Sequence, residues 1–369
     1  MEKRAKKSPA YEVVLKRLQE NISRGIYPFG ELLEPERELA SHMDVNRQTL
    51  RKALSQLVTL NMLAHEPKIG HRVVYEKLKP ATVSKDKIAL IYYRPTNLLQ
   101  MDFYYGGVYS EIALQLDQQL GWLIQLISAT KPIDEIREII KSENIKGLIT
   151  LGVMKPELMV EFNKFGIPLV SFDFDAVEFG IDSVVTDDYE GARQATNLLI
   201  HMGHTNIGYM GHVRGGGIVG PDEEFSSTLR HQGYLASLKE AGISKSFSSL
   251  TNASVESGVK AFHQLKSECP DLTALVAFVD EMAVGAIRAA ESCGLKVPED
   301  FSVIGFGDNP YIKTISNIGL STVRSEKLSE LAKASLVLLF QRMKNSSKPV
   351  MKETMAVELI VRESTAQCP

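Results

Sequence analysis

Apolar residues in the first 75 positions follow the spacing of short amphipathic helices. From residue 11 they recur three or four apart, which predicts a first helix that ends before a turn at residues 25–30. A second short helix is predicted from Glu36 to about His42, and a third begins near Asn46, a good N-cap type. After Asn61 the segment MLAHEPKIGHRVV gives two extended pieces around a turn. This order predicts a winged helix-turn-helix. The apolar positions that define the three helices are Tyr11, Val14, Leu15, Leu18 and Ile22, then Leu39, Ala40 and Met43, then Leu50, Ala53, Leu54, Leu57 and Val58.

From Lys87 onward the pattern changes to short apolar strands that alternate with amphipathic helices. One series runs from IALIYY to IPLVSF and a second from DSVVTDD to FSVIGFG. Such alternation is typical of parallel sheets covered by helices, so the fold class is α/β with two doubly wound units. Because ligands bind beyond the strand C-termini of open parallel sheets, two such units predict a hinged clamp with a ligand cleft between its lobes.

The segment between these regions, residues 76–86, lacks apolar periodicity and contains Pro80. We interpret it as a linker between a first domain, residues 1–75, and a second, residues 87–369. The length of 369 residues agrees with more than one domain, and 44% hydrophobic residues provide enough material for sizeable cores. A lone small module and global disorder are excluded.

Charge is divided unequally along the chain. Residues 1–80 carry 15 basic and 10 acidic side chains, whereas the remaining residues carry 27 basic and 35 acidic ones. A basic module on an acidic body indicates that the module alone approaches a polyanion such as DNA, although a chance imbalance is an alternative.

Targeting signals and cysteine pairs are both missing from the sequence pattern. The basic start lacks the apolar run of a secretory signal, and the late apolar stretch around Lys333 is charged and too short to span a bilayer. We therefore expect a cytoplasmic protein without a membrane partner. The cysteines Cys269, Cys293 and Cys368 are odd in number and form no CxxC pair, so neither a disulfide framework nor a zinc cluster is expected.

The outer face of the third predicted helix carries the most informative residues of the first domain. Arg47 and Arg51 stand one turn apart beside Gln48, Lys52 and Ser55. Long donors at the N-terminal end of such a helix are typical of a recognition helix that contacts base edges and phosphates. A solvated helix face is the alternative, since that is the usual place of arginine pairs.

The segment from Gly25 to Val74 resembles the DNA-binding domain of GntR-family regulators. The matching positions are Gly30, Glu36-Arg37-Glu38-Leu39-Ala40, Val45, Arg47, Thr49, Arg51, Ala53-Leu54, Leu57 and Gly70. The resemblance implies double-stranded operator DNA as a partner, with Arg37, Arg47 and Arg51 as contacts and a wing that reaches the minor groove. It also places Asn46 and Gln48 beside them, and on the wing Lys68, His71 and Arg72. Asn46 and Asn61-Met62 depart from the family pattern, which affects base preference rather than fold.

The chain from Lys87 to its end resembles the LacI-type effector domain, which is similar to periplasmic sugar-binding proteins. The stretches that carry this resemblance include LLIHMGHTNIGYMG, RHQGYLASLKEAGI and TALVAFVDEMAVGAIRAAESCGLKVPEDFSVIGFGDN, followed by GLSTV and VELIVREST. The resemblance implies that the last part of the chain crosses back through both lobes. Lobe one would then hold about residues 87–182 and 318–345, and lobe two about residues 183–317 and 346–365.

Candidate effector contacts are of the types that bind a sugar-like ligand, namely planar or bidentate polar groups and an aromatic wall. By the resemblance, Arg230 and Asp173 match contacting residues, although an ion pair at a helix start is an alternative for Arg230. Val279 and Gly307 replace an Asn and an Asp that commonly hold sugar hydroxyls, so a standard monosaccharide mode loses support. The predicted set is Phe103, Tyr104, Tyr105, Asp173, Phe174, Arg230, Asp280 and Asp308, with core packing an alternative for Phe103 to Tyr105.

Three other motifs carry less weight. Residues 215–220 spell GxGxxG, but they do not join a strand to a helix and Pro221 follows, so a flexible loop is favoured over a nucleotide site. His201 and His204 lack further metal ligands at a suitable spacing. No nucleophile elbow or acid pair defines a catalytic set.

The sequence thus predicts a DNA-binding transcriptional regulator, a repressor, that is controlled by a small-molecule effector bound between two lobes. The effector would be a sugar or sugar derivative, and the architecture resembles that of the arabinose repressor. We expect a homodimer without catalysis, cofactor or metal. A solute-binding protein without a DNA role is the alternative, and an enzyme with a regulatory domain comes third.

Overall fold

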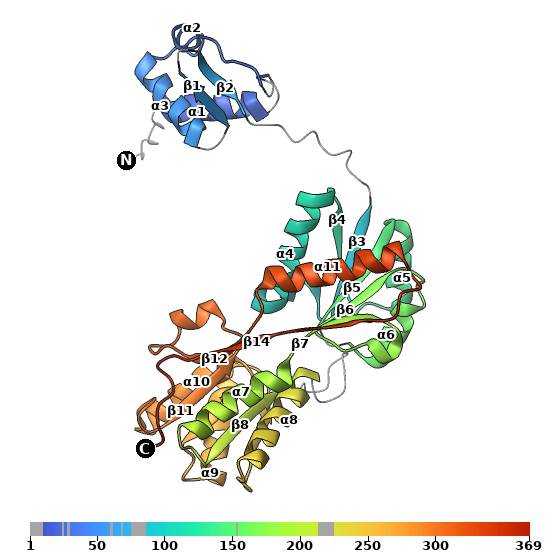
Figure 1. The fold of residues 1–369 in the computed structure, drawn as a ribbon, viewed down its shortest axis with the longest axis vertical. Helices are drawn as coiled ribbons and strands as arrows, with labels where there is room; N and C mark the ends of the chain where they lie inside the picture. Colours follow the sequence, from blue (N-terminus) through green and yellow to red (C-terminus); the bar gives the residue numbers. More distant parts are fainter. Residues whose placement is uncertain are drawn as a thin grey trace, which may run out of the picture. The chain divides into compact units, whose positions relative to one another are not determined.

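The computed structural model describes residues 10–23, 26–27, 30–59, 62–67, 69–74, 86–152, 154–212 and 225–369. The chain forms two compact units, residues 1–83 and 84–369, and each is considered by itself (Figure 1). The predicted linker, residues 76–86, lies outside the described residues except for Asp86.

The N-terminal unit is a small helical domain with a β-hairpin. The two hairpin strands are antiparallel, with Leu63 opposite Val73, and Leu32 forms an additional bridge to Arg72. The predicted apolar faces meet in one core that includes Leu18, Leu39 and Leu54. The predicted winged helix-turn-helix is therefore confirmed. Its elements are α1 (Ala10–Ser23), α2 (Glu36–His42), α3 (Arg47–Thr59), β1 (Leu63–Glu66) and β2 (Gly70–Val73).

The first lobe of the larger unit is built on a six-stranded parallel sheet in the order β13-β7-β6-β5-β3-β4. Helices α4 and α11 pack against each other on this sheet. Strand β3 is buried almost throughout, as expected for a parallel strand covered on both faces. The elements are β3 (Lys87–Tyr92), η1 (Thr96–Met101), α4 (Phe103–Leu120), β4 (Leu123–Ser128), α5 (Ile133–Ser142), β5 (Ile145–Leu151), α6 (Pro156–Asn163), β6 (Leu169–Phe172), η2 (Val177–Phe179), β7 (Asp182–Thr186), α11 (Leu328–Lys344) and β13 (Lys352–Met355).

The second lobe repeats this plan with the strand order β14-β12-β11-β10-β8-β9. All neighbours are parallel except the edge strand β14, which runs antiparallel to β12. Helices α7 and α8 pack together, as do α9 and α10. The elements are α7 (Asp188–His201), β8 (Ile207–His212), α8 (Phe225–Glu240), β9 (Phe247–Thr251), α9 (Val255–Glu268), β10 (Ala274–Ala277), α10 (Asp280–Ser292), β11 (Ser302–Phe306), η3 (Pro310–Thr314), β12 (Ser321–Ser325) and β14 (Val357–Ile360).

The chain passes between the lobes at three places, after β7, after β12 and between β13 and β14. These positions differ from the predicted lobe boundaries. Residues 182–186 and 352–355 belong to the first sheet, and residues 321–325 to the second. The physical reason is that a parallel strand pairs along its length before the chain can leave the sheet at the strand's carboxyl end. Each crossing therefore follows a strand, at the edge where the lobes face each other.

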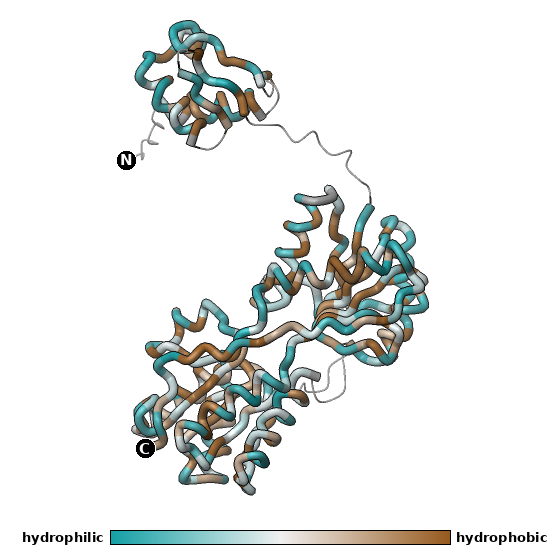
Figure 2. The backbone as a smooth tube through the Cα atoms, in the orientation of Figure 1, coloured by the Kyte–Doolittle hydropathy of each residue, from teal (hydrophilic) through white to brown (hydrophobic). Residues whose placement is uncertain are grey.

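Hydropathy along the backbone matches this layered arrangement, with apolar strands inside and more polar helix segments outside (Figure 2). The fold class predicted from the sequence, α/β with a winged helix and two doubly wound lobes, is confirmed. Among the described residues, no helix combines the length and apolarity that a bilayer crossing requires.

Candidate functional site

Helix α3 presents two arginines at its N-terminal end. The Asn46 side-chain oxygen accepts a hydrogen bond from the Thr49 backbone N–H at 2.8 Å, which fixes the start of the helix. Arg47 and Arg51 then stand one turn apart, with side chains 59% and 61% exposed. Because neighbouring side chains do not cover them, both guanidinium groups are accessible to a groove of DNA.

Glu36 at the start of α2 connects these two arginines and was not singled out from the sequence. Its Oε2 accepts a hydrogen bond from Arg51 Nε at 2.7 Å and lies 3.6 Å from Arg47 Nη2. Burial acts to raise the pKa of Glu36, but the hydrogen bond and charge of Arg51, with the charge of Arg47, outweigh it and hold the pKa below its usual value. The carboxylate therefore stays ionised and holds the two arginines close to each other.

The other predicted DNA contacts differ in their surroundings. Arg37 and Gln48 are exposed, whereas Lys68 lies outside the described residues. His71 is half-buried with its ring 4.8 Å from that of His65. Burial, and then the neighbouring His65, lower the pKa of His71. A lowered pKa favours the neutral imidazole, which is a weaker partner for phosphate than a charged one, and the predicted contact of His71 with DNA stays a prediction.

Arg72 is held within the hairpin. Its guanidinium donates to both carboxylate oxygens of Glu66, at 2.6 and 3.0 Å, and to the Gly30 carbonyl at 2.7 Å. These bonds tie the two strands and the preceding loop together. The structure therefore gives Arg72 a role in shaping the wing, and its contact with DNA stays a prediction.

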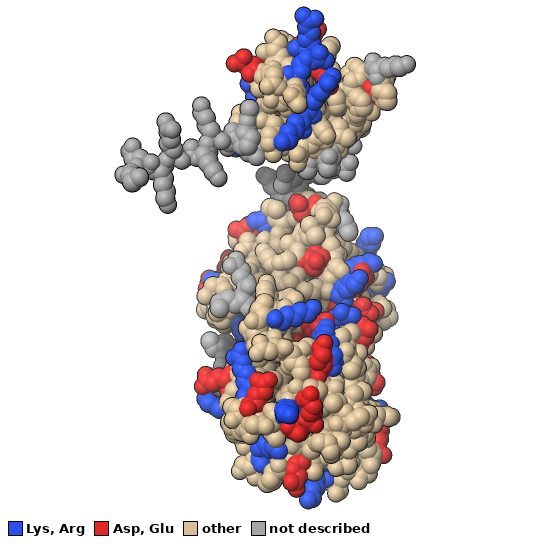
Figure 3. Space-filling view, turned by 90° about the vertical axis from the view of Figure 1, so that its left-hand side faces the viewer, with Lys and Arg blue, Asp and Glu red and all other residues tan. Residues whose placement is uncertain are grey.

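Basic side chains gather on one face of the N-terminal unit, whereas basic and acidic ones are interspersed on the visible face of the larger unit (Figure 3). This distribution agrees with the charge asymmetry in the sequence.

The larger unit contains a cleft of about 420 Å³, which is within the size range of small-molecule sites. Both lobes line it, and five of the eight predicted contacts are among the lining residues. Lobe one contributes Tyr93, Arg94, Leu98, Asp102, Phe103, Tyr104, Tyr105, Asp173 and Thr186. Lobe two contributes His212, Ser226, Arg230, Ala253, Phe278, Val279, Glu281, Phe306, Gly307, Asn309 and Ser325.

Arg230 on α8 reaches the cleft with its guanidinium already engaged. Nε and Nη2 each lie 2.8 Å from Asp188 Oδ1, and Nη1 donates to the Phe278 carbonyl at 2.5 Å. The guanidinium carbon also lies 3.5 Å from the centre of the Phe306 ring and 4.5 Å from that of Phe278. Burial alone would lower the pKa of Arg230, but Asp188 raises it above the usual value, so the guanidinium is charged. The alternative of a structural ion pair therefore agrees with the structure, and Arg230 can offer only its remaining donors to a ligand.

The lobe-one wall of the cleft is aromatic and hydrogen-bonded. The Tyr105 hydroxyl donates to Asp173, which follows β6 in a left-handed backbone conformation with φ +66°. The Tyr104 hydroxyl lies 3.2 Å from Thr186 Oγ1, and burial, followed by the charge of Asp173, raises the Tyr104 pKa well above its usual value. Both tyrosines are therefore held by hydrogen bonds at the start of α4, where they line the cleft.

Asp280 and Asp308 are not among the lining residues of this cleft, contrary to the prediction. Asp280 is 1% exposed and accepts hydrogen bonds from Thr322 Oγ1 at 2.6 Å and from the Asn309 backbone N–H at 2.7 Å. Asp308 accepts from Arg362 at 2.6 Å. Their neighbours Val279 and Gly307 face the cleft instead. Successive residues after a strand point in different directions, so the acids lie behind the wall that they were expected to form.

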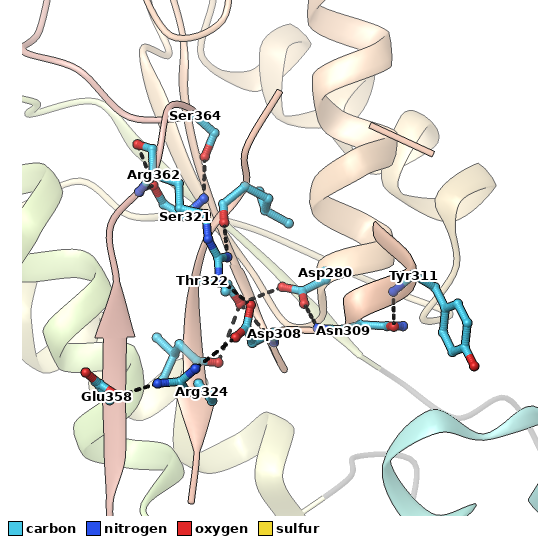
Figure 4. Close-up of polar contacts among 12 residues, drawn as sticks. Asp280, Asp308, Asn309, Tyr311, Ser321, Thr322, Arg324, Glu358, Arg362 and Ser364 are labelled. Atoms are coloured by element: carbon cyan, nitrogen blue, oxygen red, sulfur yellow. Dashed lines mark hydrogen bonds and ion pairs between the residues drawn. The ribbon is translucent and has the colours of Figure 1, made fainter. Parts of the chain in front are cut away.

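Asp308 also connects the strands that run toward lobe one. Arg324 on β12 lies 3.4 Å from Asp308 and 2.7 Å from Glu358 on β14, and Arg362 donates to the Leu320 carbonyl at 2.7 Å (Figure 4). This network fixes the ends of β12 and β14 beside the loop that carries Gly307.

Phe174, the third predicted residue outside the cleft, packs against Phe179 with ring centres 6.4 Å apart. Its role in the structure is packing within lobe one. Several lining residues were missed, although their position at the carboxyl ends of predicted strands is a signal that could have found them. These are Arg94 after β3, His212 at the end of β8, Phe278 after β10 and Phe306 at the end of β11.

The two histidines among the motifs given less weight contact other protein groups. His204 is 1% exposed, and its ring nitrogens contact Thr273 Oγ1 and the Ala366 carbonyl, so it holds the C-terminal segment. His201 contacts the carbonyl of Asn197 in its own helix. Across the described ranges, no cluster of three or more metal-binding side chains occurs. The GxGxxG stretch, residues 215–220, lies outside the described residues.

Comparison with family models gives matches in both units. Residues 10–73 match the model described as "Bacterial regulatory proteins, gntR family". Residues 196–365 match the model described as "Periplasmic binding protein-like domain". The chain thus joins a region that matches the gntR-family model to a region that matches the periplasmic-binding-protein-like model. Both resemblances predicted from the sequence are thus confirmed.

Curated relatives of this chain are transcriptional repressors and regulators. The transcriptional repressor CytR of Escherichia coli K12 is 31% identical over 235 residues, which is 63% of this chain. The match spans 66% of that repressor, just under two thirds of its length. The repressor PurR of Pectobacterium carotovorum is 29% identical over 257 residues, 68% of this chain and 72% of its own.

Solved structures share the fold. The regulator CelR in complex with cellobiose superposes with a TM-score of 0.65 at 22% identity, over 86% of this chain and 90% of its own. A lac repressor dimer bound to operator and an anti-inducer gives a TM-score of 0.64 at 20% identity, over 76% and 94% of the two chains.

Proposed function

We propose that this chain is a one-component transcriptional repressor whose winged helix binds operator DNA and whose cleft binds a small-molecule effector. The observation that carries the proposal is the pair of exposed arginines, Arg47 and Arg51, on the capped N-terminal end of α3. That they share a chain with a cleft lined from two lobes supports control by a ligand. Regulators and repressors among the relatives support the same assignment.

The DNA role is tested by selecting bound duplexes from a random library with the full chain, and then titrating the selected operator by fluorescence anisotropy at fixed salt. Arg47→Ala and Arg51→Ala should each weaken specific binding by ~1–3 kcal/mol if the side chain contacts a guanine. Arg137→Ala, which removes an arginine from α5 of the larger unit, is the matched control and should have no effect. Failure to enrich any sequence, or unchanged affinity in both α3 variants, would contradict the proposal.

The effector role follows from the two-sided lining of the cleft. A ligand can shift the equilibrium between open and closed lobes only by its different affinity for the two states, so the effector has to contact both lobes. We propose a sugar or sugar derivative, supported by aromatic walls that can cover the apolar face of a sugar ring. Solved structures of the same fold hold cellobiose and ribose, which supports this class. We propose neither a catalytic step nor a cofactor.

In this proposal the repressor acts as a homodimer that presents two α3 helices to a pseudo-palindromic operator. Closure of the lobes would change the spacing of the two helices. Light scattering of the free chain and of its operator complex tests the stoichiometry, and one chain per operator would contradict the arrangement. A thermal-shift screen against sugars and sugar acids tests the effector class, since a ligand that binds the native state raises its melting temperature.

A further inference from the structure

The charged side chains that line the cleft differ in how far the protein itself satisfies them. Arg230 is paired with Asp188. Asp102 caps α4 by accepting from the Tyr105 backbone N–H at 3.1 Å and also accepts from the Tyr92 hydroxyl at 3.1 Å. Glu281 accepts from Asn309 Nδ2 at 2.7 Å.

Asp173 is likewise engaged, by the Tyr105 hydroxyl. Arg94 differs: within the described ranges its guanidinium has no hydrogen-bond acceptor and no ion-pair partner within 4 Å, although its charge acts to lower the pKa of Asp102. A guanidinium that faces a cleft with its donors unused is suited to bind an oxyanion of a ligand.

The position of Arg94 is fixed although its donors are unused. Its backbone carbonyl accepts a hydrogen bond from Ser128 Oγ at 3.0 Å. Its guanidinium carbon lies 4.9 Å from the centre of the Tyr93 ring. Tyr93 is 2% exposed, and its ring packs edge-on against Tyr92 and Tyr105 at 4.9 and 5.4 Å. A guanidinium stacked on a buried ring loses little conformational freedom when it binds, and its planar donors match a carboxylate bidentately.

The opposite wall lacks acidic groups at the two positions nearest the strand ends. Val279 follows β10, and Gly307 follows β11 with φ +124°, a backbone conformation that favours glycine. Phe278 and Phe306 provide ring surface beside them. Lobe two therefore offers no acidic group at these two positions, although Glu281 lines the cleft beside them.

Charge balance selects among possible anions. The lining includes three carboxylates, Asp102, Asp173 and Glu281, against two arginines. A group with one negative charge fits beside Arg94 better than a dianionic phosphate, because repulsion from these carboxylates grows with ligand charge.

We propose that Arg94 forms a carboxylate subsite and that the effector is an acidic sugar, whose ring lies against the aromatic walls while its carboxylate binds Arg94. This inference rests on the proposed function and specifies its ligand. It also assigns a specificity role to a residue in lobe one, opposite Arg230.

The experiment compares matched neutral and acidic sugars by isothermal titration calorimetry on the full chain. The pairs are glucose with glucuronate, galactose with galacturonate, and cellobiose with cellobiouronate; glucose 6-phosphate serves as the phosphate probe. In the wild type, at least one acid should bind more tightly than its neutral counterpart. Arg94→Gln should weaken the binding of that acid roughly 10- to 100-fold and leave the affinity for neutral sugars unchanged, as expected for loss of hydrogen bonds to a charged group.

Arg137→Gln is the matched control, because Arg137 also stacks on an aromatic ring of lobe one, 5.4 Å from the centre of Phe165, but outside the cleft. Arg94→Lys should restore part of the affinity for the acid, since it keeps the charge without the planar fork. Equal binding of acids and neutral sugars, absence of binding by every acid, or unchanged acid affinity in Arg94→Gln would overturn the proposal. Tighter binding of the phosphate probe would overturn the carboxylate assignment.

Operator binding by the same preparations separates this inference from the proposed function. Wild type and Arg94→Gln should bind the selected operator equally in the absence of ligand. Failure of the wild type to bind any operator would count against the repressor assignment. The sugar titrations alone decide whether Arg94 forms the carboxylate subsite.

Discussion

Replacing Arg230 by methionine should destabilise lobe two, because it removes the guanidinium that is paired with the buried Asp188 carboxylate. The Asp188 side chain is 3% exposed and that of Arg230 12% exposed, so water screens the pair only weakly. Removing one member of a buried ion pair costs about 3–5 kcal/mol. For a domain of this size, each kcal/mol lowers the melting temperature by roughly 2–4 °C, which gives an expected decrease of roughly 6–20 °C.

Differential scanning calorimetry of the full chain measures this effect without any ligand. Arg288→Met is the control, since Arg288 is an exposed arginine of the same lobe with a hydrogen bond to the Ile315 carbonyl at 2.8 Å. A double variant with Asp188→Asn should recover part of the loss, because both charges are then removed together. The reasoning would be refuted if Arg230→Met lowered the free energy of unfolding by less than about 1 kcal/mol, or if the losses of the two single variants simply added in the double variant. The outcome also decides how effector assays on Arg230 variants are interpreted, since an unstable lobe weakens binding without any direct contact.

Three further predictions address other parts of the molecule. Burial raises the pKa of Asp280 to about 6, against bonds from Thr322 and Asn309 that lower it. The folded form therefore binds this proton more tightly than the unfolded chain, and stability from Asp280 is full below pH 3.8 and is lost as pH rises through about 6. In the wild type the free energy of unfolding from urea titrations should fall by about 3 kcal/mol over that pH window, and Asp280→Asn should remove this fall. Parallel pH profiles of the two proteins would argue against this assignment. Arg72→Ala should speed amide hydrogen exchange in β1 and β2, and unchanged exchange there would show that Arg72 does not hold the wing. Gly285→Ala should lower the melting temperature, since a Cβ there would lie 2.1 Å from the Val255 carbonyl of α9; an unchanged melting curve would mean that the two helices separate freely.

The periodic segments of the sequence predicted most elements of the fold because burial on one face imposes a regular spacing. The α3 face and the alternating strands from Lys87 are examples. Which strands pair across long sequence separations was harder to predict. Residues 321–325 and 352–355 were therefore placed in the wrong lobes. Nothing in a local pattern states which of two similar sheets a strand joins.

The same limit applies to the candidate sites. The exposure of Arg47 and Arg51 could be predicted because they project from a helix whose buried face is clear. Asp280 was placed in the cleft because it follows a strand, which is correct. Neighbouring side chains point in different directions, however, so Val279 faces the cleft and Asp280 is bonded to Thr322 behind it. Glu36 and Arg94 could not be recognised by type alone, since their roles depend on which groups lie beside them in space.

The threefold passage between lobes bears on how the protein is made. Lobe one begins at residue 87, yet its edge strand β13 ends at residue 355, close to the C-terminus. A ribosome therefore releases most of the second lobe before the first sheet has all of its strands. Until then, β7 offers an open edge to other nascent chains. Truncation of the last few dozen residues would accordingly damage the lobe that is synthesised first as much as the one synthesised last.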